Sequence, residues 1–175
     1  MSDNGRISLI FAFTVVAYIA IGELNTLISG WSVYLHMDAL LLVFFGLYLN
    51  RISGLLYTAL LGFLVESMYP VPGGLYLIGY LGIWLFFTWC QRRIRRQNPY
   101  HVRGVVVAIQ ALWMLVLAFV LGGQSIGTLV YWHRILVEIL ASALIIYLLT
   151  WPWCLFQKKL LYSLGWDLEA QVSHM

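Results

Sequence analysis

Residues 104–123 read GVVVAIQALWMLVLAFVLGG, a run of twenty positions without a charged side chain. A helix needs roughly 20 apolar residues to cross the hydrocarbon core of a bilayer, which is about 30 Å thick. The run is bounded by Arg103 before it and by Gln124 after it. The stretch therefore predicts one membrane-spanning helix with a defined beginning and end.

The rest of the chain has the same character. Of its 175 residues, 62% are hydrophobic and 10% are charged, whereas about 25% of the residues of a soluble globular domain are charged. A β-barrel is disfavoured because its strands would alternate in hydrophobicity. We expect an all-α polytopic membrane protein, a single integral-membrane domain over residues 1–175 with about six transmembrane helices. The expected spans are 8–28, 32–49, 53–69, 74–90, 104–123 and 130–156.

The basic residues predict the orientation of the chain, because Lys and Arg concentrate in cytoplasmic loops. With six alternating spans, nine of the ten basic residues fall on one side of the membrane, and Arg134 falls on the other. We therefore expect both termini in the cytoplasm. The nine residues are Arg6, Arg51, Arg92, Arg93, Arg95, Arg96, Arg103, Lys158 and Lys159. Their densest group, in the loop between spans four and five, is interpreted as facing lipid headgroups and not nucleic acid.

Charged side chains are costly inside a bilayer, so each one there needs a physical reason. The predicted topology places a polar cluster in the outer half of the membrane, with Glu66 of span three as a further acid. The cluster consists of Glu23, His36, Asp38, His133, Arg134 and Glu138. Two interpretations remain open: an outward-facing polar pocket, or groups that pair with one another and hold the bundle together.

One pair in this cluster follows from helical spacing alone. Arg134 and Glu138 are four residues apart, and Ser142 continues the same helix face. We expect Arg134 and Glu138 to form an ion pair within their helix. The remaining carboxylates then have no local cation, so they require water, protonation or donors from a partner.

Span three carries small residues at four-residue intervals. Gly54, Thr58, Gly62 and Glu66 share one helix face, and Gly74 follows eight positions after Glu66. Small residues at this spacing let two helices approach closely. This face is a candidate packing seam, either within the bundle or against a partner protein.

The sequence contains no recognisable catalytic motif. It has no HExxH, GxSxG or P-loop pattern. A metal site built from His36, Asp38, Glu66, His133 and Glu138 is chemically conceivable, but the two histidines are more simply polar residues at helix ends. We therefore expect no enzymatic activity, no cofactor and no metal.

The region 38–85 has a distinctive order of features. An apolar helix and a short basic turn precede Gly62, with an acid four residues later at Glu66 and Gly74 eight residues after that. This order, together with the length and hydropathy of the chain, resembles the bacterial rod shape-determining protein MreD family. The acid of that family is more often aspartate, and a proline often seen at the start of its second span is absent here.

The resemblance implies a non-enzymatic role in the bacterial inner membrane. Members of this family belong to the elongation machinery that directs lateral cell-wall synthesis, and they associate with the single-span protein MreC. Through MreC they connect to the actin-like MreB, the glycosyltransferase RodA and a penicillin-binding transpeptidase. We therefore expect a scaffold subunit that maintains rod shape through helix–helix association, with membrane lipid around it.

A transport component is the alternative. Substrate-binding subunits of energy-coupling-factor vitamin transporters resemble this chain in length and in having six helices, and an outward polar pocket would suit such a subunit. Their first helix usually carries an Ala-x-x-x-Ala pattern. The first span here has Ala12, Ala17 and Ala20, which do not produce that spacing.

Overall fold

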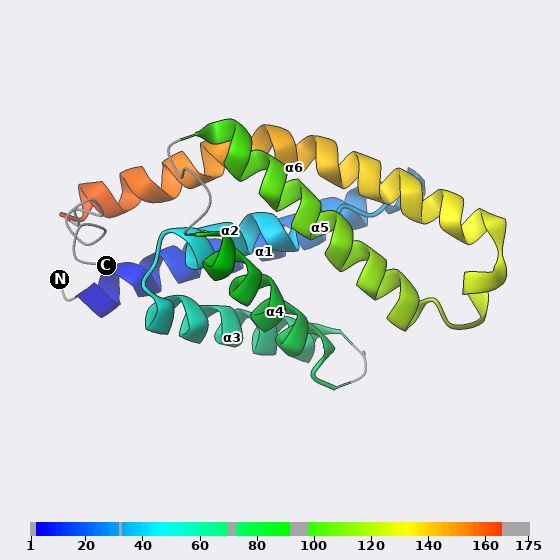
Figure 1. The fold of residues 1–175 in the computed structure, drawn as a ribbon, viewed down its shortest axis with the longest axis horizontal. Coiled ribbons are helices and arrows are strands. Elements are labelled where there is room, and N and C mark those ends of the chain that lie inside the picture. Colours follow the sequence, from blue (N-terminus) through cyan, green and yellow to red (C-terminus); the bar gives the residue numbers. More distant parts are fainter. Residues whose placement is uncertain (1–2, 32, 70–72, 92–97, 166–175) are drawn as a thin grey trace.

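The computed structural model describes residues 3–31, 33–69, 73–91 and 98–165, and this part of the chain is all-α (Figure 1). Within the predicted basic loop, residues 92–97 lie outside the described residues, as do 70–72 and 166–175. The elements are α1 (Asp3–Ile28), the 3-10 turn η1 (Ser29–Trp31), α2 (Asp38–Leu47), α3 (Arg51–Met68), α4 (Leu75–Cys90), α5 (Pro99–Leu121), the 3-10 turn η2 (Gly123–Gly127) and α6 (Leu129–Ser163).

Four helices are long and apolar enough to cross a membrane: α1, α3, α5 and α6. They correspond to predicted spans one, three, five and six, with shifted ends. Helix α6 has 35 residues, which at about 1.5 Å per residue exceeds the hydrocarbon core by roughly 20 Å. Helix α6 is therefore longer than one crossing requires, and Lys158 and Lys159 lie in its last two turns. These four helices indicate a multi-pass membrane protein.

The prediction of one continuous helix over 32–49 is wrong. The helix in this region, α2, has only ten residues and a length of about 15 Å, and residues 33–37 before it are not helical. The chain nevertheless passes here from the end of α1 to the start of α3, which lie at opposite ends of the molecule (Figure 1). An extended piece followed by a short helix has a reach of about 30 Å, similar to one membrane crossing.

Predicted span four is also shorter than a full crossing, because α4 has 16 residues and a length of about 24 Å. Of the six α-helices in the described part of the chain, four are long and apolar enough to cross a membrane, and α2 and α4 are shorter apolar helices.

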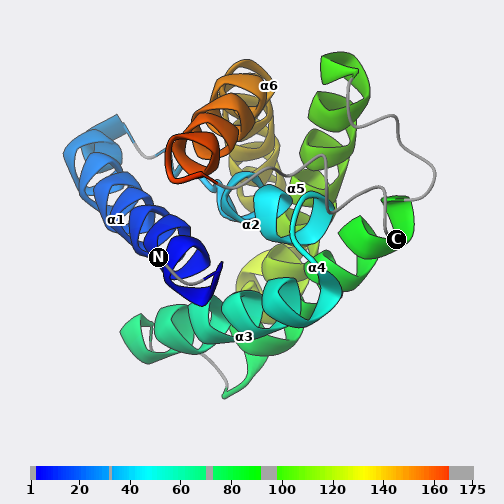
Figure 2. The ribbon, with the colours of Figure 1, turned by 90° about the vertical axis from the view of Figure 1, so that its left-hand side faces the viewer.

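Helix α2 forms the centre of the bundle. All ten of its residues are buried, and Figure 2 shows it surrounded by the other helices. The α3–α4 hairpin and the α5–α6 pair pack on it, whereas α1 lies at the edge of the bundle. The core around α2 is aromatic and aliphatic, with Phe44, Phe45 and Phe87 fully buried. A helix buried on every side has no polar face, which explains why every residue of α2 after Asp38 is apolar.

Local side chains determine where several helices begin. The Asn50 side chain accepts a hydrogen bond from the Ser53 backbone N–H at 2.8 Å and caps α3. The Asn98 side chain accepts one from the Tyr100 N–H at 3.0 Å, and Pro99 occupies the first turn of α5, where a proline costs no hydrogen bond. Asn98 and Pro99 therefore mark the start of α5.

The start of α1 and the end of α6 lie at the same end of the bundle. The Arg6 Nη1 donates a hydrogen bond to the Gly165 carbonyl oxygen at 3.2 Å. We call this the terminal end. The opposite end, which we call the distal end, holds the end of α1, the end of α3 and residues 122–128 (Figure 1). Arg51 is the first residue of α3, and Arg103 lies in the second turn of α5, near the terminal end.

Candidate functional site

A cavity of about 270 Å³ lies in the distal half of the bundle. Its walls come from α1, the non-helical segment 33–37, the start of α2, the α3–α4 turn and the first turns of α6. It is lined by Tyr18, Ile21, Gly22, Asn25, Tyr34, Leu35, His36, Met37, Asp38, Leu41, Tyr69, Tyr76, Arg134 and Glu138. The interruption of the second span creates this space, because a continuous helix over 32–49 would carry residues 33–37 along a different path.

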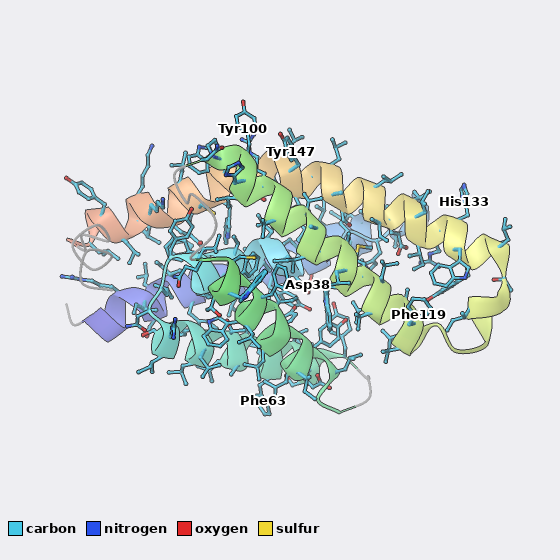
Figure 3. The ribbon with its side chains drawn as sticks, viewed as in Figure 1. Asp38, Phe63, Tyr100, Phe119, His133 and Tyr147 are labelled. Atoms are coloured by element: carbon cyan, nitrogen blue, oxygen red, sulfur yellow. The ribbon has the colours of Figure 1, made fainter. Side chains whose placement is uncertain are left out.

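The structure brings together four residues of the predicted polar cluster. His36, Asp38, Arg134 and Glu138 line the cavity. Glu23 and His133 are exposed and are not part of its wall, and Figure 3 shows His133 pointing away from the bundle. Hydropathy predicts how deep in the membrane a residue lies, but it does not predict which side of its helix the residue occupies. For this reason the sequence did not show that Glu23 and His133 lie outside the cavity wall.

The charged groups of the cavity have different partners. The Arg134 Nε donates to the Glu138 Oε1 at 3.0 Å, which confirms the pair predicted from spacing. The Glu138 side chain is 5% exposed and that of Arg134 is 59% exposed, so the pair joins a buried acid to a cation at the rim. Asp38 is 7% exposed, and its Oδ1 accepts a hydrogen bond from the Tyr80 hydroxyl. Among the described residues, no cation forms an ion pair with Asp38.

Four tyrosines form much of the remaining wall, and sequence reasoning did not identify them as a group. Tyr18 comes from α1, Tyr34 from the non-helical segment, Tyr69 from the α3–α4 turn and Tyr76 from α4. The hydroxyl oxygens of Tyr34 and Tyr69 are 3.4 Å apart. The rings of Tyr69 and Tyr76 stack with their centroids 5.7 Å apart. No periodicity relates these four positions, so only the tertiary structure brings them together.

Polar side chains hold the non-helical segment in place. The Asn25 Nδ2 donates to the Leu35 carbonyl oxygen at 2.9 Å, and the Leu35 N–H donates to the Asn25 Oδ1 at 2.8 Å. Ser142 Oγ accepts from the His36 N–H at 3.0 Å. Gln110 Oε1 accepts from the Ala39 N–H at 2.8 Å.

These bonds make irregular backbone tolerable at membrane depth, where an unpaired N–H or C=O costs several kcal/mol. The signal for them in the sequence is an isolated amide within an apolar run. Asn25 lies near the end of the first span, and Gln110 lies in the middle of 104–123. A polar side chain buried in such a run needs a partner, and here the partner is the backbone of another segment.

The predicted packing seam of span three lies inside the bundle. A Cβ atom at Gly54 would collide with the Phe45 carbonyl oxygen of α2, and one at Gly62 would lie 3.0 Å from the Leu77 Cα of α4. Thr58, between them, is completely buried. The small residues therefore let α2 and α4 of the same chain approach α3 closely.

Glu66 and Gly74 form the end of this seam. The Glu66 Oε1 accepts from the Gly74 N–H at 2.8 Å, and its Oε2 accepts from the Tyr76 N–H at 2.7 Å. Gly74 has a φ of +89°, a left-handed conformation that favours glycine. A carboxylate at the N-terminus of a helix satisfies free N–H groups and complements the helix dipole. Glu66 thus joins the end of α3 to the start of α4.

The arrangement can hold one small charged group. Within the part of the chain that the structure describes, no group of three or more His, Cys, Asp or Glu side chains is placed to bind a metal ion. Asp38, labelled in Figure 3, lines the cavity. Its carboxylate accepts from the neutral Tyr80 hydroxyl, and among the described residues it has no ion-pair partner.

Comparisons with protein-family models, with curated proteins and with solved structures find no match to this chain.

Proposed function

We propose that this protein is a non-enzymatic membrane subunit of the bacterial cell-wall elongation machinery. It would reside in the inner membrane with both termini in the cytoplasm. Its helices would associate with an MreC-like single-span protein, and through it with a RodA-like glycosyltransferase, a penicillin-binding transpeptidase and MreB. In this role the protein contributes to rod shape by holding its partners together, without a reaction of its own.

The observation that carries this proposal is the unit formed by Gly62, Glu66 and Gly74. These are the residues on which the resemblance to the MreD family rests. In the fold they act together: Gly62 permits the approach of α4, while Glu66 binds the N–H groups of Gly74 and Tyr76. All three residues thus contribute to the contact between α3 and the start of α4, and this shared structural role supports the proposal.

The exposed helix faces are the surfaces available to a partner. Because α2 and α4 already cover the small-residue seam, a partner would contact the apolar outer faces of the long helices. Large exposed side chains on these faces include Val16 on α1, Phe63 on α3, Leu112 on α5 and Leu148 on α6. Lipid and a partner helix are both apolar, so a partner can replace lipid there through close packing.

Site-specific photo-cross-linking in the native host tests the proposal. A benzophenone amino acid is placed at Val16, Phe63, Leu112 or Leu148, one position per strain, and captured proteins are identified by mass spectrometry. The matched control is Phe44, which is completely buried and should capture no partner. Capture of a single-span periplasmic protein from one helix face, together with co-purification of wall-synthesis enzymes, is the expected result. Capture of neither would refute the scaffold role.

The second candidate is the substrate-binding subunit of an energy-coupling-factor transporter, and the cavity favours it. A solute pocket in the distal half of the bundle would suit uptake from outside the cell. The same cross-linking strains would then capture a second membrane subunit accompanied by ABC-type ATPases. That outcome would support the transport function and count against the scaffold function.

A further inference from the structure

The wall of the cavity combines aromatic rings with a buried acid. Tyr18, Tyr34, Tyr69 and Tyr76 approach it from four different segments. The face of an aromatic ring carries partial negative charge and attracts a cation within about 6 Å of its centre. Tyrosine rings and hydroxyl oxygens around one space therefore favour a positively charged occupant over an anionic one.

The charged groups of the cavity wall also favour a positively charged occupant. Arg134 pairs with Glu138, so these two groups neutralise one another. Asp38 is the other acid of the lining, and it has no ion-pair partner among the described residues. Its Oδ1 accepts from the neutral Tyr80 hydroxyl. A buried carboxylate without a cation is unfavourable, and a cation that enters the cavity removes this cost.

The size and chemistry of the space limit what this cation can be. The volume of about 270 Å³ lies just below the roughly 300–1,000 Å³ of typical small-molecule sites, so it suits a compact group. A metal ion would need several hard or nitrogen ligands, and among the described residues no group of three or more His, Cys, Asp or Glu side chains is placed to supply them. Aromatic walls with one carboxylate match an organic ammonium group.

We propose that the cavity binds one organic ammonium group, which forms an ion pair with Asp38 and is enclosed by Tyr18, Tyr34, Tyr69 and Tyr76. The group belongs either to a free solute or to an ethanolamine or choline lipid headgroup at the distal surface. This inference rests on the cavity and not on the cell-wall role. For the second candidate function, it names the class of substrate.

Calorimetric titration of the full chain in detergent tests the proposal with matched probes. Choline carries a quaternary ammonium, and 3,3-dimethyl-1-butanol has nearly the same shape without the charge. We expect choline to bind and the neutral alcohol to bind at least about tenfold more weakly, because it loses the ion pair and the cation–π attraction. Equal binding of the two compounds, or no binding of choline and ethanolamine, would overturn the proposal.

Two variants locate the site. Asp38→Asn removes the charge and keeps an oxygen acceptor for Tyr80, and Tyr34→Leu removes one ring. Each should weaken choline binding by about tenfold or more. The control Glu23→Gln removes an exposed acid of α1 that does not line the cavity, and it should leave binding unchanged. If Asp38→Asn does not fold, Tyr34→Leu and the comparison of the two probes on the unaltered protein still decide the question.

Nanodiscs distinguish the two sources of the ammonium group. If a headgroup occupies the cavity, discs of phosphatidylethanolamine should suppress choline binding relative to discs of phosphatidylglycerol. If the ligand is a free solute, choline binding should be the same in both. A choline affinity that is unaffected by Asp38→Asn in a folded protein would refute the site while leaving the cross-linking test of the scaffold role unaffected.

Discussion

Asn25 on α1 binds both backbone groups of Leu35, donating to its carbonyl oxygen at 2.9 Å and accepting from its N–H at 2.8 Å. The pairing imitates the hydrogen bonds that a neighbouring strand would supply. It ties the non-helical segment to the edge helix of the bundle. Together with the bonds from Ser142 and Gln110, it fixes the path of the chain into α2 and with it one wall of the cavity.

Replacing Asn25 should therefore destabilise the fold strongly. Asn25→Ala leaves the Leu35 N–H and C=O buried and unpaired, and we expect a loss of about 2–4 kcal/mol in the free energy of unfolding. Denaturant titration in mild detergent measures it. The control is Thr26→Ala, which removes an exposed hydroxyl bound to its own helix and should change stability by less than about 0.5 kcal/mol. Equal stability of the two variants would mean that the Asn25 bonds contribute nothing.

The approach of α3 and α4 predicts a difference between two glycines. Gly62→Ala places a methyl group 3.0 Å from the Leu77 Cα, and because backbone cannot move aside locally, we expect a loss of about 1–3 kcal/mol. Gly82→Ala has no atom within 4 Å of the new methyl group and should be neutral or stabilise α4 by up to about 1 kcal/mol. Thermal unfolding of both variants shows whether each one loses or gains stability. A Gly62→Ala variant as stable as the unaltered protein would contradict the close packing of α3 and α4.

The turn between α3 and α4 depends on a carboxylate. Glu66→Gln replaces one acceptor oxygen with an NH₂ group, which must then face a backbone N–H of Gly74 or Tyr76. We expect the free energy of unfolding to fall by about 1–3 kcal/mol in a denaturant titration in mild detergent. Glu23→Gln is the matched control, because this acid is exposed, and its effect should stay within about 0.5 kcal/mol. Similar effects of both substitutions would show that the Glu66 bonds are not needed for the turn.

The orientation of the bundle can be tested with single cysteines in a chain carrying Cys90→Ala and Cys154→Ala. Ser125 lies at the distal end and Ser163 at the terminal end, and both are exposed. A membrane-impermeant maleimide applied to intact cells or spheroplasts should label Ser125→Cys, and should label Ser163→Cys only after permeabilisation. The reverse pattern would place the termini outside the cell.

The sequence alone determined the membrane class and most of the long helices. Runs such as 104–123 are too apolar for water, and the residues that cap α3 and α5 lie next to them in the chain. The ion pair between Arg134 and Glu138 was also predictable, because it depends only on the four-residue repeat of one helix. These features are local, so nearby residues are sufficient to specify them.

The tertiary structure decided where the second span breaks and which polar residues meet. Hydropathy counts apolar side chains, and it does not record that Asn25, Gln110 and Ser142 supply hydrogen bonds to the backbone of residues 35–39. For the same reason the sequence could not separate Asp38, in the cavity wall, from Glu23, on the exposed surface. These hydrogen bonds join segments that are distant in the sequence and fix the path of the chain. The cavity lies between those segments, so it forms only in the folded protein.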